Sequence, residues 1–185
     1  MSLKDLIDNN TTDKNTLHSY LETYETLFTN KRYTAKSILE IGVQFGGSIK
    51  LWNDYFINAN IYGIDIMDIN HKINDLDNSS SRINLYLNTD AYNLNVKILD
   101  KKFDIIIEDG DHLLVNQIKT LKKYLPLLED DGILIIEDIQ RIDDIIILTN
   151  ETPDEYKKFI EVYDLRKNKN RWDDILFVIN KNKRI

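Results

Sequence analysis

Short apolar runs with an acid at or next to their ends recur along the chain. They occupy residues 37–41, 60–65, 103–109 and 132–138. The runs are nearly continuous rather than alternating, which is typical of strands buried on both faces of a parallel sheet. In open α/β sheets, ligands bind beyond the carboxyl ends of the strands. The pattern therefore predicts a parallel sheet whose ligand-binding edge carries carboxylates.

Amphipathic and polar segments separate these runs. Helices are expected at residues 18–28, 49–56, 91–99, 113–128 and 143–150, and further strands at residues 83–87, 159–164 and 174–179. Residues 1–15 are expected to form a loose lead-in, residues 68–82 a short helix and loop, and residues 129–132 a turn. No helix is expected between the last two strands, so they should form an antiparallel hairpin.

Length and composition favour one domain that spans residues 1–185. The apolar fraction is 42% and the charged fraction 30%, as in globular proteins. The absence of cysteine excludes disulfides, thiolate nucleophiles and thiolate zinc sites. Because no signal-peptide pattern and no membrane-spanning run is seen, we expect a cytoplasmic protein without a membrane partner. A net charge of -7 argues against nucleic acid as the main partner.

A glycine-rich loop follows the first predicted strand and precedes a helix. Gly42, Gly46 and Gly47 have the spacing Gly-x-x-x-Gly-Gly rather than the Gly-x-Gly-x-x-Gly of dinucleotide binders. This spacing favours a site for an amino-acid or nucleoside group over a pyrophosphate cradle. Asp65, at the end of the second strand, is suited to accept both ribose hydroxyls of a nucleoside. A tight turn without ligand, and a helix cap at Asp65, remain the alternatives.

Five segments carry a resemblance to a known family. They are residues 12–14, residues 18–28 with Tyr20 and Tyr24, residues 40–48, residues 108–112 and residues 137–138. The chain resembles the class I S-adenosylmethionine-dependent methyltransferases. The resemblance is sharpest to the metal-dependent sugar O-methyltransferases of the mycinamicin and macrocin type, and to relatives described as cephalosporin hydroxylases.

The resemblance implies an α/β fold, a Rossmann-like three-layer sandwich. Its seven-stranded, mostly parallel sheet would have the order 3-2-1-4-5-7-6 with strand 7 antiparallel. The hairpin distinguishes this fold from an all-parallel nicotinamide-binding domain. Residues 1–30 would form an N-terminal segment and helix over the active site.

The resemblance also implies S-adenosyl-L-methionine as cofactor. The residues expected to bind it are Glu40, Gly42, Gly46, Gly47, Ser48, Asp65, Asp90 and Asp109. Asp90 would lie near the adenine amine. Asp65 would serve adenosylmethionine and NAD equally, so it does not distinguish the two.

Asp109, Glu137 and Asp138 follow the fourth and fifth strands, which are neighbours in that topology. Three hard oxygen ligands suit Mg²⁺ or another divalent cation. Carboxylates this close would repel one another strongly without a cation. In the resembled family these positions hold Mg²⁺, and the metal binds two vicinal hydroxyls of a sugar. The alternative for Glu137 and Asp138 is a strand end exposed to solvent.

His112 is the expected general base. A sugar hydroxyl needs help to lose its proton, and histidine has a pKa of ~6.5 that suits this task near neutrality. The resemblance assigns the base to this histidine in one subset of the family and to a nearby acid in others, so Asp111 competes for the role. Asp111 could instead cap the helix that follows.

The substrate side rests on the N-terminal segment and the last strand. The residues expected to contact substrate are Asp13, Lys14, His18, Tyr20 and Trp172, of which Trp172 could stack on a sugar or belong to the core. The substrate would be a nucleotide-sugar, a glycan end or a glycosylated small molecule. A homo-oligomer, and a place within a longer glycan-processing protein, stay open.

The main hypothesis is therefore a metal-dependent O-methyltransferase that acts on a sugar hydroxyl. Three alternatives remain at this point. They are a catechol-type O-methyltransferase, a nicotinamide-dependent oxidoreductase and a cofactor-binding module without catalysis.

Overall fold

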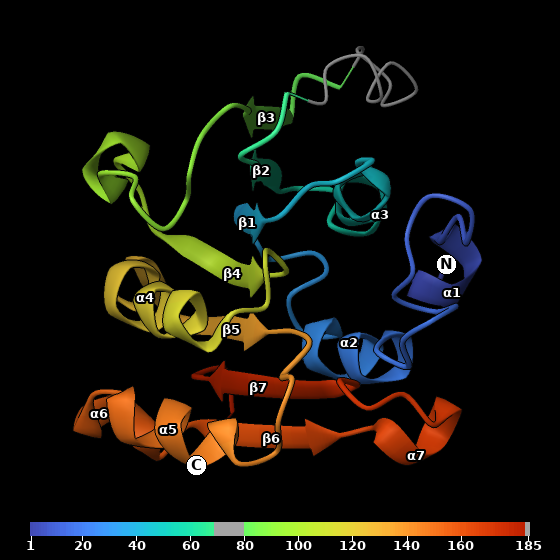
Figure 1. The fold of residues 1–185 in the computed structure, drawn as a ribbon. Coiled ribbons are helices and arrows are strands. Elements are labelled where there is room, and N and C mark those ends of the chain that lie inside the picture. The colour runs from blue at the N-terminus through green and yellow to red at the C-terminus, as the bar shows by residue number, and fades with distance from the viewer. Residues whose placement is uncertain (69–79, 184–185) are drawn as a thin grey trace.

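The computed structural model describes residues 1–68 and 80–183, and a seven-stranded sheet runs through its centre (Figure 1). The strands are β1 (Ser37–Ile41), β2 (Asn60–Ile64), β3 (Ile83–Tyr86), β4 (Phe103–Glu108), β5 (Leu128–Ile136), β6 (Ile160–Asp164) and β7 (Ile175–Asn180). Their order is β3-β2-β1-β4-β5-β7-β6. Strand β7 is antiparallel to both β5 and β6, and the other pairings are parallel. The order and the antiparallel strand confirm the predicted fold class.

Helices cover both faces of the sheet, so the fold is a three-layer sandwich (Figure 1). One face carries α1 (Leu3–Leu6), α2 (Leu21–Phe28) and α3 (Gly47–Tyr55); the other carries η1 (Val96–Leu99), α4 (Leu114–Tyr124), η2 (Leu125–Leu127), α5 (Asp144–Glu151) and α6 (Asp154–Lys157). Successive strand residues alternate between the two cores: Ile38 and Ile105 pack under α2 and α3, whereas Leu39 and Ile106 pack under α4.

An aromatic cluster holds the N-terminal helix α2 against α3. Phe28 meets Trp52 edge to face with ring centroids 5.6 Å apart, and Tyr24 meets the same ring at 5.5 Å. All three side chains are buried. Each aromatic pair contributes about 0.5–1.5 kcal/mol beyond its buried area. The segment that precedes α2 is therefore anchored next to the loop between β1 and α3.

Two predictions of local structure within the first hundred residues were wrong. Residues 1–15 are not a loose lead-in, because Ser2 and Asp5 form a capping box that begins α1 and Leu3 is buried. Residues 91–99 are not an α-helix. Asp90 accepts a hydrogen bond from the N–H of Tyr92, and Asn95 accepts one from Lys97, so turns and the short η1 replace it.

Two further predictions were wrong in the second half of the chain. Residues 129–132 were expected to form a turn, but they lie within β5, beside an irregular register between Phe103 and Ile105. A short helix, α7 (Arg166–Lys169), lies between β6 and β7, where none was expected. Most of the predicted helix and loop at 68–82 lies outside the described residues. Within the described part of the chain, no helix is long and apolar enough to cross a membrane.

Candidate active site

A cavity of about 440 Å³ opens at the carboxyl edge of the sheet. It is bordered by the N-terminal segment, the loop after β1, the ends of β2 and β3, and the segments that follow β4 and β5. Ten of the predicted site residues line it: Asp13, Gly42, Gly47, Ser48, Asp65, Asp90, Asp109, Asp111, His112 and Asp138. Most of the expected cofactor residues, and two of the three expected metal residues, therefore share one cavity.

The loop after β1 requires glycine at position 42. Gly42 has φ 89°, in the left-handed region that side chains rarely adopt. A Cβ atom at this position would lie 1.9 Å from the backbone oxygen of Asp109. Glycine at this position therefore lets the loop after β1 pass directly against the segment that follows β4.

Asp65 shapes the same loop. Its Oδ2 accepts hydrogen bonds from the N–H groups of Val43, at 2.8 Å, and Gln44, at 3.0 Å, while Oδ1 accepts one from Met67 at 2.8 Å. The carboxylate lies at the cavity wall. Asp90 also lines the cavity, and the hydrogen bond from Asn93 lowers the pKa of its carboxyl.

Glu40 and Ser48 support the loop from beneath. Glu40 is fully buried and accepts hydrogen bonds from Ser48, at 2.8 Å, and from the indole of Trp52, at 3.2 Å. Burial raises the pKa of Glu40 to about 7. Glu40 does not line the cavity, so direct cofactor contact by this residue stays a prediction.

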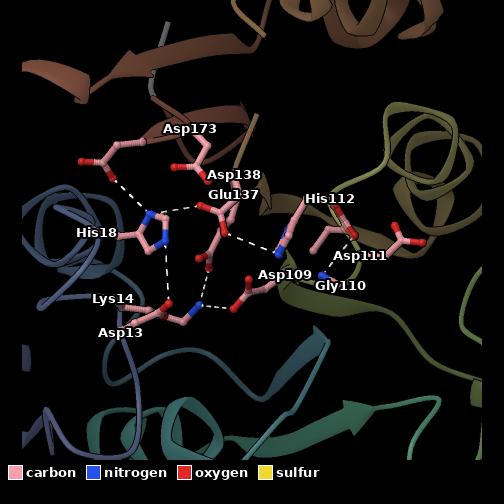
Figure 2. A network of polar contacts seen from close by, with 12 residues as sticks. Asp13, Lys14, His18, Asp109, Gly110, Asp111, His112, Glu137, Asp138 and Asp173 are labelled. Carbon is pink, nitrogen blue, oxygen red and sulfur yellow. Dashed lines mark hydrogen bonds and ion pairs between the residues drawn. The ribbon is translucent and has the colours of Figure 1, made fainter. Parts of the chain in front are cut away.

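A buried lysine lies among the acids (Figure 2). Nζ of Lys14 is 2.7 Å from Oδ2 of Asp109 and 2.6 Å from Oε1 of Glu137. Oε1 of Glu40 is 3.5 Å away. Burial alone would lower the pKa of Lys14, but these three acids outweigh it and raise that pKa well above its usual value. Lys14 is therefore the counter-ion of this cluster.

Asp138 lies between two imidazole rings (Figure 2). Nδ1 of His18 is 3.1 Å from its Oδ1, and Nε2 of His112 is 3.7 Å from its Oδ2. The hydroxyl of Tyr20 donates a hydrogen bond to Oδ1. Burial, together with the charge of Asp109, raises the pKa of Asp138 to about 7. His112 and Asp138 both have positive φ, 58° and 53°, a strained backbone conformation that is common at functional sites.

Asp111 has a structural role in the observed arrangement. Its Oδ1 accepts a hydrogen bond from the N–H of Leu113 at 3.1 Å, and its Oδ2 accepts one from the side chain of Asn116 at 2.6 Å. These bonds stabilise the turn that leads into α4, as in the capping alternative considered for this residue. His112, by contrast, has no such side-chain bond and lines the cavity.

The remaining predicted residues lie at different distances from the cavity. Gly46 begins α3 with φ 79°. Lys14, His18 and Tyr20 are buried beneath the acids rather than at the cavity wall. Glu137 likewise lies below the wall, where Lys14 and the hydroxyl of Tyr24 bind it. Trp172 is 59% exposed and does not line the cavity, so sugar stacking by this residue stays a prediction.

Four residues of the site, namely Tyr92, Glu108, Asn116 and Asp174, were given no role on the basis of the sequence. Tyr92 and Asn116 line the cavity, and Tyr92 also donates a hydrogen bond to the buried Glu108. Asp174 is fully buried and accepts a hydrogen bond from the backbone of Ser19. Glu108 carried a visible signal, since it ends a strand. Tyr92 and Asn116 carried none, because no motif marks them.

Among the residues that the structure describes, two groups of side chains lie close enough together to hold a metal ion. In one, ligand atoms of Asp109, His112 and Asp138 all lie within 4.8 Å of one another. In the other, the same holds for Glu40, Asp109 and Glu137, but Nζ of Lys14 contacts all three. The first group borders the cavity, and its donor set of two carboxylates and an imidazole fits a divalent cation.

Comparisons with known proteins agree with this arrangement. No protein-family model matches the chain. It is 31% identical over 136 residues to mycinamicin VI 2''-O-methyltransferase of Micromonospora griseorubida, covering 66% of this chain and 32% of the relative. It is 28% identical over 138 residues to 8-demethyl-8-alpha-L-rhamnosyl tetracenomycin-C 2'-O-methyltransferase of Streptomyces olivaceus, covering 69% of this chain and 35% of the relative. The chain thus spans about a third of the length of these curated relatives.

Solved structures give the same picture. MycE methyltransferase, from the mycinamycin biosynthetic pathway and in complex with Mg, SAH and mycinamycin VI, matches with a TM-score of 0.63 and 30% identity, covering 75% of this chain and 37% of that one. A second MycE structure, with Mg and SAH, matches the fold over 97% of this chain and 55% of that one, with a TM-score of 0.70 and 23% identity. Strand order, glycine loop and these similarities together show that the chain has the fold of the class I S-adenosylmethionine-dependent methyltransferases.

Proposed function

We propose that the chain catalyses transfer of a methyl group from S-adenosylmethionine to a sugar hydroxyl, assisted by a divalent metal ion. One observation carries this proposal. The glycine loop with Asp65 and the group of Asp109, His112 and Asp138 line a single cavity. Cofactor and acceptor would therefore meet in one enclosed space, as group transfer requires.

The loop after β1 and the acids of β2 and β3 would bind the cofactor. Bound S-adenosylmethionine supplies the methyl group as a sulfonium. Gly42 and Gly47 line the cavity and would meet its amino-acid part through their backbone, and Asp65 would offer a carboxylate to the ribose hydroxyls. Asp90 lines the cavity beyond β3 and would contact the adenine amine.

Asp109 and Asp138 would hold the metal ion, beside His112. When bound, a divalent cation lowers the pKa of a coordinated hydroxyl. Glu137, the third predicted ligand, has one oxygen bound to Lys14 and Tyr24 in the structure, which leaves its other oxygen for a ligand role. Metal ligation by each of these residues stays a proposal.

His112 would accept the proton of the acceptor hydroxyl. Its side chain is 30% exposed, it lines the cavity and its Nε2 faces Asp138. Asp138 can orient the ring and stabilise the imidazolium that forms. Asp111 is the weaker candidate, because both of its carboxylate oxygens are occupied by hydrogen bonds in the turn before α4.

A glycosylated small molecule is the favoured class of acceptor. Several relatives are named as O-methyltransferases of glycosylated compounds, including a rhamnosyl tetracenomycin and mycinamicin VI. The metal-binding group also suits an acceptor with neighbouring hydroxyls, which can chelate a cation. Catechols share this feature, so the acceptor must be decided by experiment.

The decisive experiment combines binding and turnover. Calorimetry should show binding of S-adenosylhomocysteine in preference to NAD, and methyl transfer to a rhamnoside should require Mg²⁺. Tight binding of NAD alone would overturn the methyltransferase proposal. Turnover of catechols with inert rhamnosides would retain methyl transfer but overturn the sugar assignment.

A further inference from the structure

Lys14 is the buried cation that joins three strands. Its side chain is 1% exposed, and its Nζ contacts acids at the ends of β1, β4 and β5, namely Glu40, Asp109 and Glu137. The nearest ligand atoms of these acids lie within 4.8 Å of one another. Three carboxylates at this spacing repel one another unless a cation lies between them. Figure 2 shows the Lys14 side chain pointing toward Asp109 and Glu137.

The backbone that carries Lys14 forms part of the cavity wall. Thr11 and Asp13 line the cavity together with residues of the loop after β1. A Cβ atom on Gly47 would lie 2.1 Å from the backbone oxygen of Thr11, so the two backbones touch. The carbonyl of Asp13 accepts hydrogen bonds from the N–H groups of residues 16–18, and that of Lys14 accepts one from Tyr20. Residues 11–20 therefore form one folded strap that begins at the glycine loop.

We propose that Lys14 is a positioning residue whose ion pairs with the acids of β1, β4 and β5 hold residues 11–20 closed over the cofactor cavity. The resemblance to sugar methyltransferases suggested a substrate contact for this residue. The structure favours a different role, because Nζ is buried and the side chain does not line the cavity. The inference rests on the proposed function only in naming the cavity's ligand.

Loss of the ammonium group should open the strap. Methionine at position 14 fills a similar volume but leaves the acid cluster without its counter-ion. Hydration would then stabilise the charged acids. Water can reach them only if residues 11–20 move away. Because the cavity is complete only in the closed state, the apparent affinity for cofactor falls by the fraction of molecules that remain closed.

Hydrogen exchange and calorimetry test the proposal with Lys14→Met. In the unliganded protein we expect amide exchange of residues 16–20 to accelerate by about tenfold or more, because opening breaks the hydrogen bond from Ser19 to Asp174 and exposes the turns of the strap to water. The affinity for S-adenosylhomocysteine should fall by a similar factor of about ten. Lys14→Arg keeps the charge, so it should retain part of the exchange protection and part of the affinity of the wild-type protein.

Lys31→Met is the matched control. Lys31 is also buried and lies 2.7 Å from Asp131 and 3.4 Å from Asp104, at the opposite edge of the sheet. The Lys31→Met variant should have a lower melting temperature, but unchanged amide exchange at residues 16–20 and unchanged cofactor affinity. If Lys14→Met fails to fold, Lys14→Met combined with Glu137→Gln removes one charge of each sign and is measured in the same way.

Wild-type exchange at residues 16–20 in the Lys14 variants would overturn the proposal. So would equal acceleration in Lys31→Met, since the effect would then be general destabilisation. If the wild-type protein binds no S-adenosylhomocysteine, the proposed function fails. The exchange experiment still decides the role of Lys14 in that case, because it needs no ligand.

Discussion

The hydroxyl of Tyr92 donates a hydrogen bond of 2.6 Å to Oε1 of Glu108, a carboxyl group with no exposed surface. The second oxygen of this carboxyl has no hydrogen-bond partner. Burial is the main cause that raises the pKa of Glu108 to about 8, against an ordinary value of 4.5. The folded protein therefore holds a proton on Glu108 more tightly than the unfolded chain does.

This difference predicts that stability falls as the pH rises. A group whose pKa is higher in the folded state contributes its stability fully below pH 4.5 and loses it as the pH passes through about 8. Asp138 and Glu40, whose pKa values are raised to about 7, act in the same direction. Without divalent ions, the melting temperature should decline from pH 5 to pH 8, and Glu108→Gln should make this decline shallower.

Glu161→Gln is the control for that experiment. Glu161 also accepts a hydrogen bond from a tyrosine, Tyr163, at 2.7 Å, but its pKa is lowered. Its contribution is therefore lost only as the pH falls below the ordinary range of a carboxyl, outside the window measured. The variant should keep the wild-type slope from pH 5 to pH 8, and an unchanged slope in Glu108→Gln would contradict the assignment.

Replacement of His112 by alanine should abolish most turnover. Removal of a general base typically costs about 10²–10⁴-fold in rate. Affinity for S-adenosylhomocysteine and the melting temperature should change little, because the ring is partly exposed and has no hydrogen-bond partner at Nδ1. Rates with a rhamnoside acceptor, measured alongside calorimetry, check the prediction.

Asp111→Asn separates the two candidate bases. Asparagine can still accept the hydrogen bond from Leu113, so the turn before α4 should persist. We expect most of the turnover to remain in this variant. A loss as large as that of His112→Ala would assign the proton transfer to Asp111 instead.

Removal of divalent ions should stop turnover without unfolding the protein. The acid cluster keeps Lys14 as an internal counter-ion, so the fold does not depend on an added metal. Added Mg²⁺ should raise the melting temperature with a dependence on its concentration, because it binds the folded state alone. Asp138→Asn should weaken that dependence. Full turnover in the presence of a chelator would refute the role given to the metal.

Gly42→Ala should destabilise the fold more than an ordinary surface substitution. The left-handed backbone alone costs a residue with a Cβ about 1–2 kcal/mol. The added methyl group would also lie 1.9 Å from the backbone oxygen of Asp109. Lys50→Ala, on the exposed surface of α3, should change the free energy of unfolding by at most about 0.5 kcal/mol. Urea unfolding of both variants provides the measurement, and equal stability would be inconsistent with this geometry.

The buried strands were predictable from the sequence pattern, and their order from the family resemblance, whereas several short segments were predictable from neither. A nearly continuous apolar run such as residues 103–108 is favoured in the middle of a sheet, so its pattern outweighs local preference. Residues 91–99 lack that constraint. There the side chains of Asp90 and Asn95 compete for backbone N–H groups and prevent an α-helix.

The candidate site was predictable to the extent that strand ends mark it. Asp65 and Asp109 follow strands directly, Asp138 comes two residues after β5, and all three line the cavity. The partners of Lys14 could not be predicted, because Asp109 and Glu137 lie 95 and 123 positions away and no local pattern signals the contact. A lysine in a polar stretch gives every appearance of a surface residue.

The separation of Lys14 from Glu137 also bears on how the protein is made. A chain that leaves the ribosome from its N-terminus exposes this lysine long before the end of β5 has been synthesised. The strap has no complete set of partners until then, whereas β1, α3 and β2 are close in sequence and can associate early. Assembly of the cavity is thus expected among the last events of folding. A closed strap would then indicate that the chain has been synthesised at least to the end of β5.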